Sequence, residues 1–106
     1  MSEDRPEWDA AFADRLSGAL VLVGITRHEP AGPETDQFFG TVEAADPRKG
    51  VTLLLMGSRS GERFRFPPDL RVFSEANPGS YRLRASGETV EDPDYLAVWE
   101  IYPSAS

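Results

Sequence analysis

Four arginines alternate with apolar residues in two short segments of the chain, and the guanidinium group is well suited to binding anions. Arg63 and Arg65 flank Phe64, and Arg82 and Arg84 flank Leu83. Residues two apart in a strand point to the same face. If both segments lie in one sheet, the four guanidinium groups share a face that would bind a small anion, a nucleotide or an acidic partner. The simpler interpretation is a solvated face on which these arginines pair with the protein's own acids.

The other residues that could do chemistry do not form a catalytic set. The only histidine, His28, stands beside Glu29 in a segment rich in proline and glycine, and we interpret it as exposed and ion-paired. Ser58 and Ser60 fall in a glycine-flanked turn that lacks the strand-to-helix elbow of a serine nucleophile. A cluster of acids lacks the alternating pattern of a calcium loop, and we interpret it as a solvated loop. Its members are Glu88, Glu91, Asp92 and Asp94.

These patterns predict no metal, no cofactor and no catalytic residue. They favour a protein that is not an enzyme, with a hydrolase based on a pair of carboxylates as a minor alternative. The chain has 106 residues, 18 acids against 11 lysines and arginines, and a net charge of −7. Because phosphate contacts need a basic surface, this charge argues against nucleic acid as a partner.

Cysteine is absent from the chain, which excludes disulfides, thiolate metal sites and cysteine nucleophiles. The acidic first residues do not fit a secretory signal. No apolar stretch reaches the ~20 residues that a membrane-spanning helix needs. We therefore expect a cytoplasmic protein without a membrane partner.

The hydrophobic pattern predicts a single, mainly β domain over residues 1–106. Trp8, Phe12 and Leu16 recur at helical spacing and Pro6 suits a first helical turn, so we expect a helix over 6–17. Prolines and glycines indicate a loop over 27–36, and the segment 92–96 predicts a helical turn. Apolar or alternating segments predict five or six strands, at 19–26, 37–45, 50–56, 62–66, 81–84 and 97–102.

The segment from Phe38 to Met56 resembles the central strands of SH3-like and Sm-like small β-barrels. It combines Gly40 in one strand, Asp46 in the next turn and an apolar strand that returns after Gly50. The resemblance implies a barrel of five or six strands over 19–102, preceded by the helix. The Sm-like RNA site does not carry over, because the turn at 46–50 offers no aromatic ring for stacking. Sm-like barrels often form rings, and an unpaired edge strand permits homo-oligomers.

The chain as a whole also resembles a family of small uncharacterised bacterial proteins. The resemblance rests on the segments 22–26, 37–40, 67–69, 78–84, 87–88 and 92–94 and on Trp99. It implies a bacterial, cytoplasmic origin and supplies no activity.

The missing catalytic set makes a non-enzymatic interaction module our leading functional hypothesis. We expect it to bind a protein or peptide on an exposed strand edge or in a groove. The acidic charge suits a basic partner, which the protein would neutralise. The alternative is a binder of small anions or nucleotides that uses the arginine strip, defined as Arg63, Arg65, Arg82 and Arg84.

Overall fold

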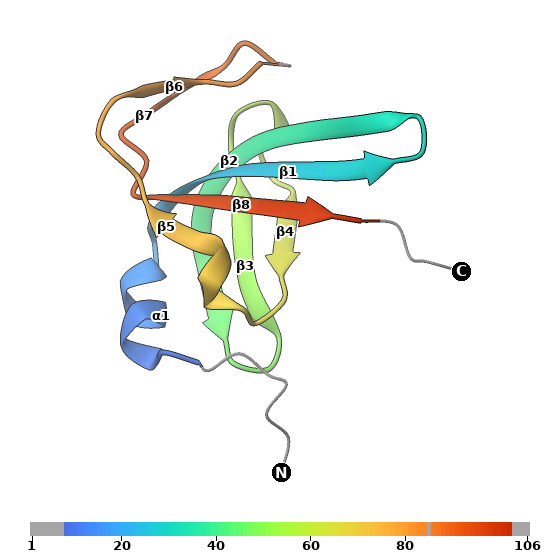
Figure 1. The fold of residues 1–106 in the computed structure, drawn as a ribbon. Coiled ribbons are helices and arrows are strands. Elements are labelled where there is room, and N and C mark those ends of the chain that lie inside the picture. Colours follow the sequence, from blue (N-terminus) through green and yellow to red (C-terminus); the bar gives the residue numbers. More distant parts are fainter. Residues whose placement is uncertain (1–7, 85, 103–106) are drawn as a thin grey trace.

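A computed structural model describes residues 8–84 and 86–102, in which one α-helix precedes eight β-strands (Figure 1). The helix α1 spans Ala10–Leu16, and two short 3-10 helices, η1 and η2, span Gly57–Arg59 and Leu70–Val72. The strands are β1 (Leu20–Glu29), β2 (Gly32–Asp46), β3 (Gly50–Leu55), β4 (Arg63–Phe66), β5 (Phe73–Glu75), β6 (Ser80–Arg82), β7 (Thr89–Glu91) and β8 (Tyr95–Ile101). The prediction of a mainly β protein with a helix before the first strand is confirmed.

Six strands form one sheet in the order β4-β3-β2-β1-β8-β5, and β6 and β7 form a separate antiparallel pair. Within the large sheet only β1 and β8 run parallel. The large sheet is not closed by hydrogen bonds, since β4 and β5 remain its two edges. It nevertheless curls strongly: Phe66 of β4 lies 5.2 Å from Phe73 of β5, measured between ring centroids. The two edge strands therefore meet through their side chains.

The main core lies on the concave side of this curl. Val21, Val23 and Ile25 alternate with less buried residues along β1 and point into the core. Phe66 is fully buried, and its ring also contacts those of Phe64 and Trp99 at centroid distances of 4.9 and 5.6 Å. An aromatic cluster thus fills the space that the open sheet encloses.

The β6–β7 pair forms a second, smaller layer beside the large sheet (Figure 1). Leu83 and Val90 are each 2% exposed but do not belong to the main core cluster. Three hydrogen bonds tie this layer down: Arg84 N–H donates to Gln37 Oε1 of β2, and the Glu88 carboxylate accepts from the N–H and from the hydroxyl of Ser58 in η1. The second layer is therefore anchored by polar contacts as well as by its own buried side chains.

The helix begins later than the sequence predicts. Asp9 is extended, and its Oδ1 accepts a hydrogen bond of 3.1 Å from Phe12 N–H, as an N-cap residue does. Residues 8 and 9 are therefore outside the helix, and residues 6 and 7 lie outside the described part of the chain. The aspartate cap, and not the proline, sets the start of the helix.

The loop predicted over 27–36 is wrong, because β1 and β2 continue through it as a paired hairpin that reaches Glu29 and Gly32. Gly32 has a φ of +131°, which the tight turn requires. Val42 N–H of β2 donates to Ala19 O beside β1. The alternation of the ladder therefore turns the nitrogen of Pro33 away from β1, where its missing N–H costs no hydrogen bond.

The helical turn predicted over 92–96 is also wrong. Asp92 has a φ of +48°, and Tyr95 and Leu96 already pair with Val21 and Leu22 of β1. Pairing with a distant strand overrides the local preference of this segment. Together with the short strands β5 and β7, such long-range pairing raises the number of strands above the predicted five or six.

Candidate functional site

The arginine strip is divided between the two sheets. Arg63 and Arg65 lie on β4, at one edge of the large sheet, whereas Arg82 lies on β6 and Arg84 follows that strand. The four residues were expected to share a face if both segments lay in one sheet, and the two segments do not lie in one sheet. A shared anion site on these arginines stays a prediction.

Arg63 has an acidic partner of the kind that the simpler interpretation expects. Its Nε donates to Glu43 Oε1 at 2.7 Å, and this hydrogen bond raises the pKa of Arg63. Arg65, Arg82 and Arg84 form no ion pair with any described residue. An exposed pair such as Arg63 and Glu43 is worth ~0–1 kcal/mol, so it leaves the function of the strip open.

The acidic cluster acts as a set of cross-links between segments. Each of its four carboxylates accepts a hydrogen bond of 2.8 Å from another segment; the donors to Glu88, Glu91, Asp92 and Asp94 belong to Ser58, Ser80, Gly79 and Leu20, respectively. Hydrogen bonds from Ser86 and then from Ser58 lower the pKa of Glu88. In the described part of the chain, no three His, Cys, Asp or Glu residues are grouped so that they could hold a metal ion.

β8 has a free backbone edge over its second half. β1 pairs with β8 from Tyr95 to Ile101, but β5 pairs with it only from Tyr95 to Ala97. Ala76 N–H, just after β5, donates to Asp94 O at 3.2 Å. The alternation of this ladder points the N–H and C=O groups of Val98 and Glu100 away from β1. The last pair of the β5 ladder, Phe73 with Ala97, is held by a hydrogen bond from Val98 N–H to the carbonyl of Val72 in η2. The N–H and C=O groups of Glu100 lie beyond this pair and face the free edge.

Apolar side chains gather at the same place. Among the described residues, four large apolar side chains are exposed, and three of them belong to β8 or follow it: Val98 (63% exposed), Ile101 (42%) and Tyr102 (66%). The fourth, Met56, follows β3. Clustered exposed apolar residues indicate a contact surface, whereas scattered ones do not. We call residues 98–102 the β8 edge.

A polar cluster orders the end of the β8 edge. His28 Nε2 lies 2.8 Å from Glu100 Oε1, and the Tyr102 hydroxyl donates to the same oxygen at 2.9 Å. The rings of His28 and Tyr102 stack with centroids 4.3 Å apart. The hydrogen bond with His28, followed by that with Tyr102, lowers the pKa of Glu100. His28 contacts an acid as expected, but this acid is Glu100 across the β1–β8 ladder and not the neighbouring Glu29, and the His28 side chain is only 35% exposed.

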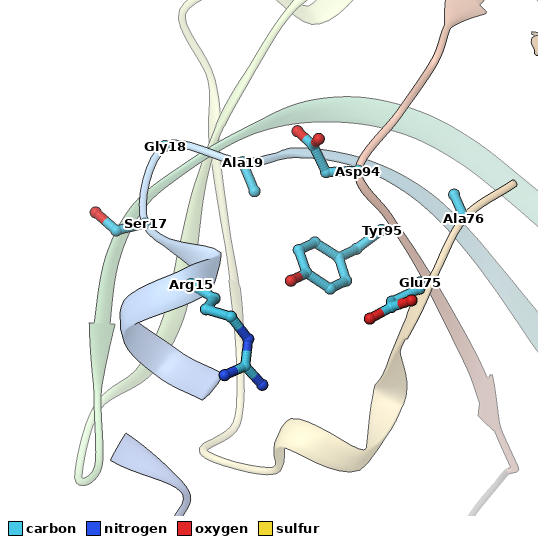
Figure 2. Close-up of a pocket in the computed structure, with 8 residues that line it drawn as sticks. All are labelled: Arg15, Ser17, Gly18, Ala19, Glu75, Ala76, Asp94 and Tyr95. Atoms are coloured by element: carbon cyan, nitrogen blue, oxygen red, sulfur yellow. The ribbon is translucent and has the colours of Figure 1, made fainter. Parts of the chain in front are cut away.

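A groove of about 560 Å³ opens at the other end of β8 (Figure 2). Arg15 projects into it from α1 and Glu75 from β5, and the ring of Tyr95 lies between them (Figure 2). This volume falls within the range of about 300–1,000 Å³ that is typical of small-molecule sites. The lining residues are Arg15, Ser17, Gly18, Ala19, Glu75, Ala76, Asp94 and Tyr95.

Sequence reasoning missed both the groove and the β8 edge as individual sites. Arg15 and Glu75 carry no shared motif, and only the packing of α1 beside β5 and β8 brings them to one groove. The apolar residues at 98–102 were visible, but they are typical of any strand. Their exposure follows from the short length of β5, which no local pattern indicates.

No helix in the described residues has the length and apolar character needed to cross a membrane. Comparison of the chain with protein-family models, with curated protein sequences and with solved structures gave no match. The function is therefore argued from the geometry of the molecule.

Proposed function

We propose that this protein is a non-enzymatic interaction module that receives an extended segment of a partner protein along the β8 edge. The proposal rests on one observation about where two features lie. The backbone groups that point away from β1 and the exposed apolar side chains occupy the same few residues, 98–102.

The backbone of the edge supplies the binding groups. An unpaired strand edge is a template for a further strand, and main-chain hydrogen bonds give such complexes their affinity. Glu100 offers one N–H and one C=O beyond the last pair of the β5 ladder. A strand bound there would extend the line of β5 along β8 (Figure 1). This space is not filled by β5 itself, because the chain forms η2 before Phe73.

The side chains supply the apolar contact. Val98 lies on one face of β8 and Ile101 on the other, so a bound segment would cover apolar surface on both sides. Complete burial of one such side chain is worth about 1.5–3 kcal/mol, and both are already partly covered. After the cost of ordering the partner segment, we expect a dissociation constant of about 1 μM to 1 mM.

A basic partner suits this surface. The net charge of the chain is −7, and Glu100, whose side chain is 52% exposed, lies on the edge itself. Charge of this sign would steer a basic protein toward the edge and neutralise it on binding. Association should then slow as salt is added, because salt screens charges beyond about 10 Å at 0.1 M ionic strength.

The finer description of the fold belongs to the same proposal. We infer an SH3/Sm-like small barrel that closes through side chains instead of a hydrogen-bonded ladder. The contact between Phe66 of β4 and Phe73 of β5 supports this inference. The two prolines after β4, Pro67 and Pro68, cannot donate ladder hydrogen bonds and so oppose closure at that point. A cytoplasmic location is proposed on the absence of cysteine.

Binding can be tested with short peptides that are selected from a displayed library for affinity to the protein. Glu100→Pro removes an N–H that faces the free edge and leaves the ladder with β1 intact. Glu100→Gln, which keeps this N–H and lacks the carboxylate, is its control. Ile101→Ala and Met56→Ala form a matched pair, since both side chains are 42% exposed and only Ile101 lies on the β8 edge.

We expect Glu100→Pro to bind at least about tenfold more weakly than Glu100→Gln, through the lost hydrogen bond and the blocked edge. Ile101→Ala should weaken binding several-fold, and Met56→Ala should leave it unchanged. The proposal fails if Glu100→Pro, shown by circular dichroism to be folded, binds the selected peptides as tightly as Glu100→Gln does.

A further inference from the structure

The groove lined by Arg15, Glu75, Asp94 and Tyr95 carries charges of both signs on different walls. We propose that it binds a small zwitterion with a free ammonium and a free carboxylate, supplied either by a free amino acid or by a short peptide. The groove lies at the opposite end of β8 from the β8 edge (Figures 1 and 2), so this site is independent of the function proposed above.

Arg15 provides the positive wall. It stands in the last turn of α1, and its guanidinium carbon lies 5.4 Å from the centroid of the Phe12 ring. The Phe12 ring in turn meets the ring of Tyr95 edge-on at 5.5 Å. Arg15 forms no ion pair with any described residue. Its planar fork is therefore held by aromatic packing and remains available to a carboxylate, which it can bind with two parallel hydrogen bonds.

Glu75 and Asp94 provide the negative wall. Glu75 stands opposite Tyr95 in the β5–β8 ladder, and no described residue donates a hydrogen bond to its carboxylate. Asp94 is held firmly: its Oδ2 accepts from Leu20 N–H at 2.8 Å, and its own N–H donates to Leu20 O. Its Oδ1 accepts no hydrogen bond from the described residues. An ammonium has three donors and can bind the Glu75 carboxylate while it donates to a second acceptor in the groove.

The floor of the groove matches a polar ligand of small size. The Tyr95 side chain is 9% exposed and lies between Arg15 and Glu75 (Figure 2). Ala19 and Ala76 are small and leave space beside it. A simple anion would meet two carboxylates and a simple cation would meet a guanidinium, so each is opposed by one wall. A zwitterion satisfies both walls, and the volume of about 560 Å³ also admits a short peptide.

The test is a titration of the full chain followed by two-dimensional amide NMR. The probes are glycine and diglycine, with N-acetylglycine and glycinamide as controls that lack the ammonium or the carboxylate. We expect saturable shifts at Gly18, Ala19 and Ala76 with at least one uncapped probe, and at least about tenfold weaker binding of both capped probes. Tighter binding of glycine than of diglycine would identify a free amino acid as the source, and the reverse order a peptide.

Variants of the two walls should agree with the probes. Arg15→Gln and Glu75→Gln each remove one charge and should weaken binding at least about tenfold. Arg48→Gln is the matched control for Arg15→Gln, because it removes the same charge from an exposed residue outside the groove, and it should leave binding unchanged. Glu100→Pro should also leave these shifts unchanged, which keeps a failure here distinct from a failure at the β8 edge.

Three results would overturn the proposal. The first is the absence of saturable shifts with either uncapped probe. The second is binding of glycinamide as tight as that of glycine, which would indicate a cation site. The third is equally tight binding of N-acetylglycine, which would indicate an anion site.

Discussion

Substitution of Gly50 by alanine should destabilise the protein far more than the same change at Gly61. Both glycines have left-handed φ angles, +103° at Gly50 and +95° at Gly61. A Cβ on Gly50 would overlap the carbonyl oxygen of Phe66 in the neighbouring strand, whereas a Cβ on Gly61 would meet no atom within 4 Å. The pair therefore shares the backbone strain and differs in the steric overlap.

The magnitudes follow from these two contributions. The left-handed conformation costs alanine about 1–2 kcal/mol. Alanine also lowers the conformational entropy of the unfolded chain, which offsets about 0.4–1 kcal/mol of this cost. Gly61→Ala should thus lose about 1 kcal/mol or less. At Gly50 the overlap is with backbone, so β3 and β4 must separate locally and leave a buried group unsatisfied, which adds about 1–3 kcal/mol.

Thermal unfolding followed by circular dichroism measures the difference. A loss of 1 kcal/mol lowers Tm by about 4–8 °C in a domain of this size. We expect Gly50→Ala to melt at least about 5 °C below Gly61→Ala. Equal melting temperatures would show that β4 does not approach β3 as closely at Gly50 as the structure requires, and the reasoning would be refuted.

Three further predictions concern the core and the polar clusters. Phe66→Ala should cost about 3–5 kcal/mol in urea unfolding, because the ring is fully buried in the aromatic cluster; a loss below about 1 kcal/mol would contradict that packing. Hydrogen bonding, first from Ser86, lowers the pKa of Glu88 from its ordinary 4.5. Its stabilising effect is therefore present above the unfolded pKa and is lost as pH falls through the lower folded pKa. The free energy of unfolding of the wild type should exceed that of Glu88→Gln above the pKa range of Glu88, and this difference should shrink as the pH falls through that range. A difference that does not change with pH would refute the link between the Glu88 hydrogen bonds and stability. The hydrogen bond with Glu100 raises the pKa of Tyr102 above 10.0. Glu100→Gln should return it toward that value in an ultraviolet titration, and no change would mean that the bond is not formed.

The elements that local pattern predicts well are those whose burial alternates within the large sheet. In β1, Val21, Val23 and Ile25 mark the buried face of the strand, and in β4 the alternation of residue types marks it in the same way. The hairpin over 27–36 was missed because Pro33 is typical of loops, and only its place on an outward-facing edge makes it compatible with a strand. Similarly, the start of the helix depends on the Asp9 cap.

The sites were less predictable than the strands because they depend on which segments become neighbours. Arg63 and Arg82 stand in similar alternating segments, yet their strands belong to different sheets. The parallel pairing of β8 with β1, and the short β5 beside it, place Glu100 at a free edge. Both features arise from contacts between residues far apart in the chain, for which the sequence contains no local signal.

Amide hydrogen exchange of Glu100, with and without a peptide selected for binding, tests the central claim most directly. The proposed function predicts that this amide exchanges rapidly in the free protein and becomes protected in the complex, as amides do when a strand is added to a sheet edge. If the Glu100 amide still exchanges rapidly when the protein is saturated with the peptide, the partner binds elsewhere and the assignment of function to the β8 edge is contradicted.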